Sequence, residues 1–438
     1  MRIGRSVDVL VVGAGPVGMM TALALAEKNH KIAIVDKSWR TSSQSYALAL
    51  HPSTVRFLRE RGLVHEALRG AHPVTEVAIY HSMAARAGTV LPIGGGGGFP
   101  LLVLPQNEFE SALEGELEKR GVRVRWNHRA AAISEDGKGV SVLVEELEKY
   151  TGGYSVATME WVVSRARHVH AQYLVGADGH RSIVRRHLDA DYREAGRSEL
   201  FAVFEFESDR PADSAMSLVL TEETSNVLWP LGGHRWRWSF ELQGEHDFAE
   251  EREKHRVSMH FGDECFPALD AGALTSFIAA RAPWFDASVE QVHWSLAVRF
   301  ERKLARPVGA RRCWMVGDAV HLTGPAGVQS MNAGLAEALE LSGAISEALR
   351  GRGTDALEGY ARGTEAEWRR LLGLERRFRP GAVTPPWIRK NWDRILPALP
   401  GHREDLDRLA GALGYVDRPP DIGDQGGLDV DRHPLESR

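Results

Sequence analysis

The chain has 438 residues, 43% of them hydrophobic and 26% charged, and it carries a formal net charge of −5. A chain of this length can bury a substantial core and hold about two or three structural units. Because it is mildly acidic and has no block of lysine or arginine, we do not expect it to bind nucleic acid.

The first predicted element is a strand, a turn and a helix near the N-terminus. No charged residue occurs from Val9 to Ala26, a pattern that a signal peptide or a membrane-spanning helix would also show. Glycines and a proline interrupt this stretch, however, and Val7–Val12 is a β-branched run typical of a buried parallel strand. We therefore expect a soluble protein with no transmembrane segment.

The turn after this strand, GAGPVG, matches the G-x-G-x-x-G pattern of dinucleotide-binding loops. Its first glycine permits a sharp turn, its second lets the backbone approach a pyrophosphate, and its third lets the helix pack on the strand. A second strand, Lys31–Asp36, ends in a carboxylate where the ribose hydroxyls need one. This carboxylate disfavours a 2′-phosphate, so the ligand is expected to be FAD or NAD rather than NADP. The predicted contacts are Gly13, Gly15, Pro16, Gly18, Asp36 and Lys37.

A second unit of the same kind follows further along the chain. The segment Gln106–Trp126 predicts a helix and a strand that add a parallel layer to the sheet. The segment Tyr173–Leu188 then runs from an apolar strand through Asp178 and Gly179 into a basic helix. An isolated Asp-Gly is commonly a simple turn, but this context favours a second ligand-facing turn.

The middle of the chain predicts a separate sheet. Short alternating segments within Phe201–Leu242 are separated by turn residues, as in an antiparallel sheet. The last of them is RWRWSFEL, Arg235–Leu242. Its tryptophans are expected on one face and its arginines on the other, and core packing explains most such tryptophans.

A third glycine-rich turn, GDAVHLTGPAGVQSMNAG, occupies Gly317–Gly334, between an apolar strand at Cys313–Val316 and a helix. This arrangement points backbone N–H groups at an anion or a polar ring. After Arg350 the sequence predicts two charged helical segments. The proline-rich tail from Arg379 to Arg438 shows no recognisable site.

Together the three turns resemble the class A flavoprotein monooxygenases related to para-hydroxybenzoate hydroxylase. The matching motifs are GAGPVG with Asp36, VGADGHRSIVR and GDAVHLTGPAGVQSMN, and the resemblance covers roughly Val7 to Arg350. It implies an α/β fold with a Rossmann-like FAD-binding domain built on a parallel sheet, a mainly antiparallel β-sheet substrate domain and C-terminal helices. The expected boundaries are residues 1–75, 100–188 and 296–350 for the FAD-binding domain, 76–99 and 189–295 for the substrate domain, and 351–438 for the C-terminal helical segment and tail.

The resemblance also implies roles for single residues. Asp318 would hold the ribityl chain, Pro325 would lie beside the isoalloxazine ring, and Asn332 would lie near its pyrimidine edge. A helix N-terminus there would stabilise the negative charge of reduced flavin. Gln106 either contacts the flavin chain or faces solvent at the start of its helix. The cofactor-binding residues implied in this way are Gln106, Asp178, Gly179, Asp318, Pro325, Gly327, Ser330, Met331 and Asn332.

The chain departs from the family pattern at two places. The usual Gly-Gly-Gln-Gly is here Gly327–Ser330, with a valine and a serine that can present their N–H groups if φ stays negative. Tyr46 stands where relatives carry an arginine near the flavin. The resemblance therefore leaves open whether the reductant is NADPH or NADH. The resemblance makes a planar aromatic substrate the expected partner, and the pocket candidates are Tyr46, Trp229, Trp236 and Trp238.

The expected reaction follows from the cofactor. NADPH or NADH reduces FAD, O₂ adds at flavin C4a, and the hydroperoxide transfers one oxygen atom to an aromatic or other electron-rich small molecule. The protein must exclude water so that the hydroperoxide does not collapse. Two alternatives remain: an FAD-dependent reductase or dehydrogenase that acts without O₂, and a non-catalytic FAD-binding protein.

Other chemistry is not expected. The histidines form no clear metal-binding pair, so we predict no metal, and the sequence identifies no catalytic base. Cys265 and Cys313 are too far apart for a metal knuckle or a redox pair. Two inert thiols are typical of a protein in the reducing cytoplasm.

Overall fold

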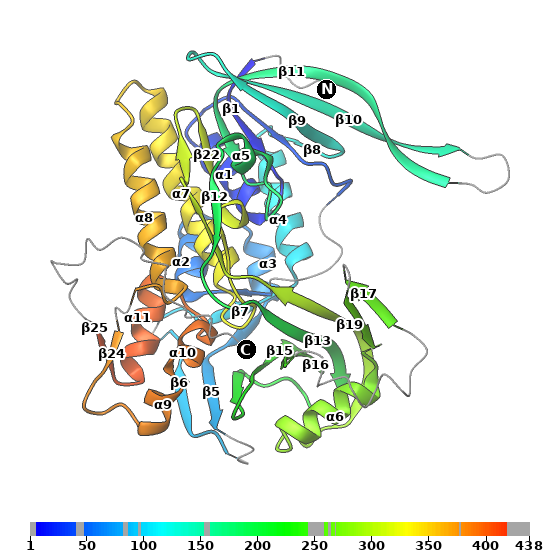
Figure 1. Ribbon diagram of the computed structural model, residues 1–438, viewed down its shortest axis with the longest axis vertical. Coiled ribbons are helices and arrows are strands. Elements are labelled where there is room, and N and C mark those ends of the chain that lie inside the picture. The colour runs from blue at the N-terminus through cyan, green and yellow to red at the C-terminus, as the bar shows by residue number, and fades with distance from the viewer. Residues whose placement is uncertain are drawn as a thin grey trace, which may run out of the picture.

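The computed structural model describes residues 6–40, 48–81, 86–94, 98–152, 158–243, 258–261, 264–267, 269–375 and 378–417. Its strands form two large sheets, one in the upper half of Figure 1 and the other at the bottom, with short strands between them. The predicted α/β fold class is confirmed.

The first sheet has the strand order β21-β22-β11-β1-β2-β8. The strands from β22 to β8 join through parallel pairs, as the buried run at Val7–Val12 predicts. Antiparallel strands β10 and β9 extend it from β11. The strands of this sheet are β1 Ser6–Val12, β2 Ile32–Val35, β8 Val124–Arg125, β9 His128–Glu135, β10 Val140–Gly152, β11 Thr158–Gly176, β21 Gly309–Ala310 and β22 Cys313–Met315.

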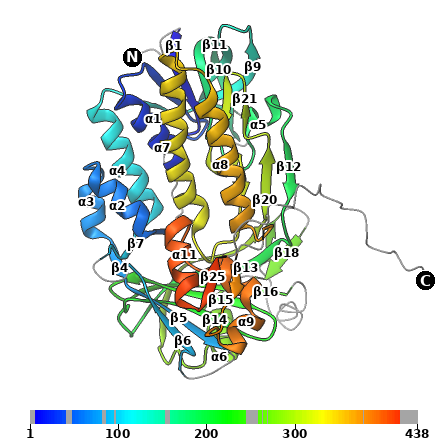
Figure 2. The same ribbon diagram turned by 90° about the vertical axis from the view of Figure 1, so that its left-hand side faces the viewer.

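Helices cover this sheet. Helix α1 packs against α4 and α7, and α7 packs against α8, which lies alongside it in Figure 2. The helices of this half are α1 Pro16–Ala26, α2 Pro52–Glu60, α3 His65–Gly70, α4 Gln106–Lys119, α5 Ile183–His187, α7 Gln329–Leu349 and α8 Asp355–Leu371.

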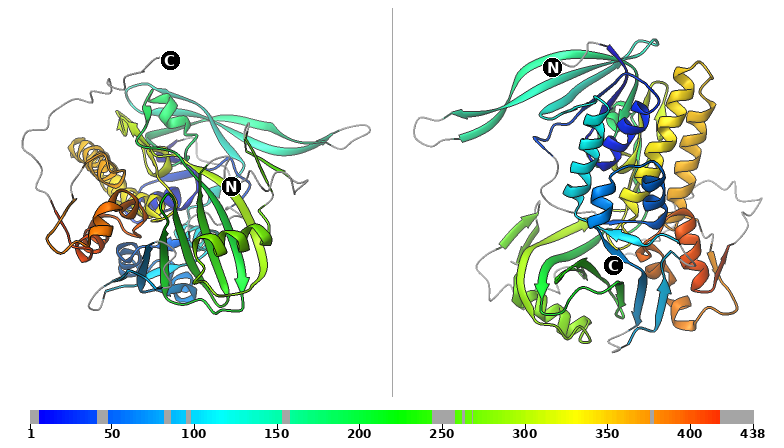
Figure 3. Two further views of the ribbon diagram at one scale, coloured as in Figure 1. Left: turned by 60° about the horizontal axis from the view of Figure 1, so that its bottom comes forward. Right: turned by 180° about the vertical axis from the view of Figure 1, so that it is seen from behind.

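A long ribbon made by β10 and β11 extends away from the body of the protein (Figures 1 and 3). The sequence predicted only the end of β11, at Tyr173. Trp161 and Val163, further out on the same strand, are each 46% exposed. The outer part of the ribbon therefore lacks the buried apolar face by which a strand is usually recognised.

The second sheet has the order β19-β13-β16-β15-β14-β5-β6, and its neighbours are antiparallel except for the parallel pair β14–β5. The predicted antiparallel sheet is thus confirmed, with strands from two separate parts of the chain. Helix α6, Ala271–Arg281, packs against one of its faces. The strands are β5 Glu76–His81, β6 Thr89–Pro92, β13 Glu199–Ser208, β14 Ala215–Leu220, β15 Ser225–Gly232, β16 Arg235–Leu242 and β19 Val289–Phe300.

Small sheets connect the two halves, and the C-terminal segment packs beside them. The connecting strands are β3 Ala49–Leu50, β4 His72–Val74, β7 Leu101–Val103, β12 Asp191–Glu194, β20 Lys303–Arg306 and β23 His321–Leu322, with a hairpin of β17 Ser258–Phe261 and β18 Glu264–Pro267. The C-terminal elements are β24 Phe378–Pro380, α9 Pro386–Lys390, α10 Trp392–Ile395, the 3-10 helix η3 Leu396–Ala398, α11 Arg403–Ala412 and β25 Tyr415–Asp417. In the described part of the chain, no helix has the length and apolar character needed to span a membrane.

Candidate functional site

The turn after β1 lies directly against the turn after β11, so the first two predicted motifs meet. The Gly13 N–H donates to the Val35 carbonyl at 2.8 Å, and Gly13 has a φ of +103°. A Cβ atom at this position would lie 2.1 Å from the Ala177 carbonyl oxygen. Only glycine allows both the backbone conformation and the close approach.

The Asp36 carboxylate lies beside the same turn, at the end of β2. Its Oδ2 accepts the Ala14 N–H at 2.7 Å, and its Oδ1 accepts the Ser38 N–H at 2.7 Å. Asp36 is half-buried and the neighbouring Lys37 is exposed. The two hydrogen bonds fix the orientation of the carboxylate beside the turn, where the sequence predicts that it accepts ribose hydroxyls.

Asp178 occupies the second turn. Its Oδ2 accepts the Ile183 N–H at 2.6 Å, whereas its buried Oδ1 has no hydrogen-bond partner within the described ranges. Burial raises the pKa of this carboxyl group. A buried acceptor needs a donor to offset its desolvation, which a cofactor hydroxyl or amide can supply.

The third motif begins with a tight turn at Gly317–Ala319, which buried Glu337 holds in place. Glu337 Oε2 accepts the Gly317 N–H at 3.1 Å and faces His321 Nε2 at 3.0 Å, and Oε1 accepts the Trp368 indole N–H at 2.6 Å. Burial would raise the pKa of Glu337, but His321 and these hydrogen bonds outweigh it and lower the pKa. Glu337 is therefore an ionised carboxylate that fixes the turn.

Asp318 is presented by this turn with its side chain exposed. Its Oδ1 accepts a hydrogen bond from Ser330 Oγ at 2.5 Å, and its backbone carbonyl accepts one from the Tyr192 hydroxyl at 3.2 Å. The resemblance implied only a backbone role for Ser330. The structure adds a side-chain role, because the serine hydroxyl orients the Asp318 carboxylate.

The glycine-rich loop enters α7 at Gln329, so the predicted helix entry is present. Pro325, Ser330 and Met331 are half-buried, and Gly327 is buried. This arrangement leaves the first N–H groups of α7 without partners inside the helix, as at every helix N-terminus.

The condition of a negative φ is not met at Val328. Val328 has φ 49° and ψ 36°, in the left-handed region, and it caps the N-terminus of α7. Such a conformation costs a β-branched residue roughly 1–3 kcal/mol. Burial offsets this cost, because the side chain packs in an apolar core with Leu399 and Trp229.

Asn332 supports the loop from inside the protein. Its Nδ2 donates to the Ala49 carbonyl at 2.9 Å and to the Val328 carbonyl at 2.8 Å. Its Oδ1 accepts the His51 N–H at 2.8 Å. The side chain is fully buried, so its polar atoms bind protein backbone.

Two buried histidines meet behind the loop. His51 Nε2 lies 2.9 Å from the Gly327 carbonyl oxygen, and His51 Nδ1 lies 2.9 Å from His402 Nδ1. His402 precedes α11, in the C-terminal segment where the sequence showed no site. The structure brings that segment against the third motif, and no local pattern around His402 signals it.

The buried His51 predicts a pH-dependent stability. Burial lowers its pKa from 6.5 to about 4, against a smaller opposite effect of Asp405. The neutral imidazole therefore stabilises the fold fully above about pH 6.5, and this contribution is lost as the pH falls toward 4. The loss amounts to roughly 3 kcal/mol in the free energy of unfolding.

Urea unfolding of the wild type and His51→Gln at a series of pH values measures this effect. We expect the wild type to lose more stability than His51→Gln between about pH 7 and pH 4. Burial also holds the pKa of His402 well below its usual value. Acidification therefore lowers the free energy of unfolding through His402 in both proteins. Equal pH dependence of the two proteins would contradict the assignment.

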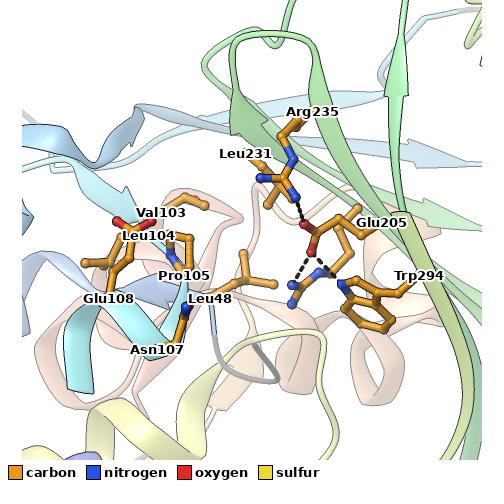
Figure 4. Close-up of a pocket in the computed structure, with 11 residues that line it drawn as sticks. Leu48, Val103, Leu104, Pro105, Asn107, Glu108, Glu205, Leu231, Arg235 and Trp294 are labelled. Carbon is orange, nitrogen blue, oxygen red and sulfur yellow. Dashed lines mark hydrogen bonds and ion pairs between the residues drawn. The ribbon is translucent and has the colours of Figure 1, made fainter. Parts of the chain in front are cut away.

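A cavity of about 270 Å³ lies between the second sheet and the start of α4 (Figure 4). Glu205 stands on its sheet side and accepts hydrogen bonds from Arg235 at 2.5 Å, Arg237 at 2.8 Å and Trp294 at 3.0 Å. Burial lowers the pKa of Arg237, and the neighbouring Glu205 carboxylate partly offsets this lowering. The cavity is lined by Leu48, Val103, Leu104, Pro105, Asn107, Glu108, Glu205, Leu231, Arg235, Arg237 and Trp294.

The tryptophan candidates do not line this cavity. Trp236 and Trp238 lie on the opposite face of β16, at most 1% exposed, in a core with residues of α6. Trp229 pairs with Arg237 and so shares the cavity-facing side of the sheet, but it is buried in the same apolar cluster as Val328. The alternation in RWRWSFEL predicted both faces correctly. The position of α6 decides which face is core, and the arginines on the other face line the cavity.

The remaining site candidates have simple positions. Gln106 opens α4 as predicted, and its side-chain amide donates to Glu110 at 2.7 Å. Gly179 follows Asp178 in the second turn with a φ of 72°. Tyr46 lies outside the described residues, so its predicted position near the cofactor stays a prediction.

One group of metal-ligand type occurs among the described residues. Atoms of Glu135, His187 and Cys313 lie within 4.8 Å of one another. Glu135 already pairs with Arg311 at 3.0 Å and with His187 at 3.2 Å. Burial and Glu135 raise the pKa of the Cys313 thiol to about 12. This group therefore resembles an ion-pair cluster around one carboxylate more than a set of metal ligands.

Comparison with known proteins agrees with this geometry. Residues 6–367 match a family model described as an FAD binding domain. The chain belongs to this family. The predicted resemblance is confirmed at the level of the family, and FAD is the cofactor for which the family is named.

Relatives of this FAD-binding protein include monooxygenases. It is 26% identical over 361 residues to the 6-methylpretetramide 4-monooxygenase of Streptomyces rimosus, covering 80% of this chain and 57% of that protein. It is also 26% identical over 452 residues to a 12-dehydrotetracycline 5-monooxygenase/anhydrotetracycline 6-monooxygenase of Streptomyces rimosus subsp. rimosus, covering 98% of this chain and 79% of the relative. The chain thus spans little more than half the length of the first relative.

The fold matches a solved structure closely. The p-nitrophenol 4-monooxygenase of Pseudomonas putida DLL-E4 superposes with a TM-score of 0.68 at 19% identity, covering 94% of this chain and 97% of that one. At this identity the likeness concerns the fold.

The turns of this FAD-binding protein fit FAD. The open backbone at Gly15, where an added Cβ would meet nothing within 4 Å, leaves room for a pyrophosphate. Asp36 would hold the adenosine ribose, the unpartnered Asp178 Oδ1 would accept a cofactor donor, and exposed Asp318 would hold the ribityl chain. The N-terminus of α7 would face the electron-rich edge of the ring.

Substituting alanine for the first two glycines of GAGPVG should have different effects, on stability at Gly13 and on FAD affinity at Gly15. In Gly13→Ala the added Cβ collides with Ala177 and the φ of +103° is strained, so the free energy of unfolding should fall by at least about 2 kcal/mol. Gly15→Ala should leave stability nearly unchanged but weaken FAD binding, because its methyl group fills space that the pyrophosphate needs. Unfolding curves of the cofactor-free proteins and FAD titrations check this. A Gly15→Ala protein with wild-type FAD affinity would contradict the predicted cradle.

Proposed function

We propose that this protein is an FAD-dependent monooxygenase. It uses NADPH or NADH and O₂ to insert one oxygen atom into an aromatic or other electron-rich small molecule. The route is the C4a-hydroperoxide route that the resemblance implies. FAD supplies the electron transfer and oxygen activation when bound. The chain binds the cofactor, orients the substrate and excludes water. We also propose the division into a discontinuous FAD-binding domain, a substrate domain and a C-terminal segment at the boundaries predicted from the sequence.

The observation that carries this proposal is that one short segment both contacts the loop before α7 and lines the cavity. Leu48 lines the cavity, Ala49 accepts the Asn332 amide, and His51 meets the Gly327 carbonyl. The cavity therefore adjoins the entry to α7, where the flavin ring is expected. A substrate in the cavity would lie beside the redox end of the cofactor, as direct oxygen transfer requires.

The cavity also favours a kind of substrate. Apolar Leu48, Val103 and Leu231 line it together with Arg235 and Arg237. Such a mixture suits a planar ring system that carries polar oxygen substituents. The two relatives described above are named for the oxygenation of 6-methylpretetramide and of 12-dehydrotetracycline and anhydrotetracycline, which supports an aromatic, oxygen-bearing substrate for this protein.

Purified protein tests the proposal against its alternatives. We expect bound FAD, oxidation of NADPH or NADH that a phenolic or polyketide-like aromatic stimulates, oxygen uptake, and a product heavier by one oxygen atom. Stimulated oxidation without oxygen in the product would instead indicate a reductase or dehydrogenase. FAD binding without stimulated turnover across such a panel would indicate a non-catalytic FAD-binding protein.

A further inference from the structure

The C-terminal segment packs directly on the loop that leads into α7. A Cβ atom at Gly327 would lie 2.6 Å from the Leu399 carbonyl oxygen and 2.8 Å from that of Pro397. The Gln329 side-chain amide donates to the same Leu399 carbonyl at 3.3 Å. Glycine is therefore required at residue 327 because backbone from the far end of the chain occupies the space of a side chain.

The histidine pair extends this contact into a directed chain of hydrogen bonds. The Gly327 carbonyl can only accept, so His51 Nε2 must carry a proton and donate to it. His51 Nδ1 is then a bare acceptor, and His402 Nδ1 must carry the proton between them. The hydrogen-bond partners thus determine the tautomers of both neutral rings.

The loop needs such support because its conformation is strained. Val328 is left-handed, and its carbonyl is held by Asn332 while the preceding carbonyl, on Gly327, is held by His51. Both supports are buried, and so is His402. Removing one of them should let the backbone relax away from the geometry that aims the first N–H groups of α7.

We propose that His51 and His402 are positioning residues of the flavin site. The segment Leu396–His402 sets the orientation of the loop amides at Gly327–Ser330. Through these amides it sets the reduction potential of bound FAD. The inference rests on the proposed function only in that FAD occupies this site. Amides aimed at the pyrimidine edge stabilise the anionic reduced ring more than the oxidised ring. Loosening the loop should therefore weaken the binding of reduced FAD more than that of oxidised FAD.

The test uses the full chain with FAD and no substrate. In His51→Leu the donor to Gly327 is lost, and the affinity for reduced FAD relative to oxidised FAD should fall by about tenfold, which makes the potential about 30 mV more negative. His402→Leu should give a smaller shift of the same sign, since His51 keeps its own donor. His51→Gln, whose amide can donate to the same carbonyl, should restore most of the wild-type potential. Exposed His65→Ala on α3 is the matched control and should leave the potential unchanged.

Isotope-labelled histidine gives a readout that needs no variant, in case a substitution prevents folding. Nitrogen chemical shifts of the wild type should show a proton on Nε2 of His51 and on Nδ1 of His402. The opposite tautomers, or a wild-type potential in a folded His51→Leu protein, would overturn the inference and leave the proposed function intact. A wild type that binds no FAD would overturn the proposed function itself.

Discussion

Asp318→Ala is expected to lower the affinity for FAD by about ten- to a hundredfold. The substitution removes a charge-assisted hydrogen bond to the ribityl chain, worth roughly 1.5–3 kcal/mol. The carboxylate is prepared for this contact, because Ser330 Oγ orients it and Glu337 fixes the turn that carries it. Fluorescence titration of the apoprotein with FAD measures the dissociation constant.

Two variants refine this result. Asp318→Asn keeps a polar group of the same size and should lose less affinity than alanine. Ser330→Ala leaves the carboxylate but removes the hydroxyl that orients it, so its loss should be a few-fold at most, as expected for one exposed hydrogen bond. If the dissociation constant of Asp318→Ala equals that of the wild type, Asp318 does not hold the cofactor.

Ser330→Pro is expected to separate cofactor binding from oxygen transfer. Ser330 is the second residue of α7, and its N–H is one of those free to face the flavin ring. Proline removes this donor while the contacts at GAGPVG remain, so the protein should keep bound FAD. Losing one aimed donor commonly costs about a hundredfold or more in rate, so product formation should be largely lost and residual turnover should release H₂O₂.

The measurements are the flavin potential and the ratio of product to NADPH or NADH consumed. The potential should become more negative because the anionic reduced ring loses a donor. Ser330→Ala is the control, since it also loses the hydroxyl bonded to Asp318 but keeps the amide. A proline variant that matches the alanine variant in potential and in coupling would show that this helix entry does not face the isoalloxazine ring.

The cofactor cradle could be predicted because its signals are local. A strand, a glycine-rich turn and a helix follow one another within about twenty residues, and the turn geometry demands glycine at residue 13. The same holds for Asp36 and for the turn that presents Asp318. The structure forms each of these turns where the sequence predicts one, and the cofactor contacts themselves stay predictions.

The sequence could not decide which face of β16 meets the cavity, for a topological reason. Alternation places tryptophans and arginines on opposite sides of the strand, and an apolar face is equally suited to a core or to an aromatic pocket. Only the packing of α6 on the tryptophan side shows that this face is core. The arginines and Glu205 then face the cofactor half of the protein.

By itself the sequence determined the α/β class, the positions of the three glycine-containing turns and the family, because hydrophobic period and glycine spacing report on backbone structure close along the chain. Only the tertiary structure decided which face of the second sheet meets the cofactor and that Val328 is left-handed. It also brought His402 behind Gly327. These features depend on contacts between residues far apart in the chain, and burial there outweighs local conformational preference.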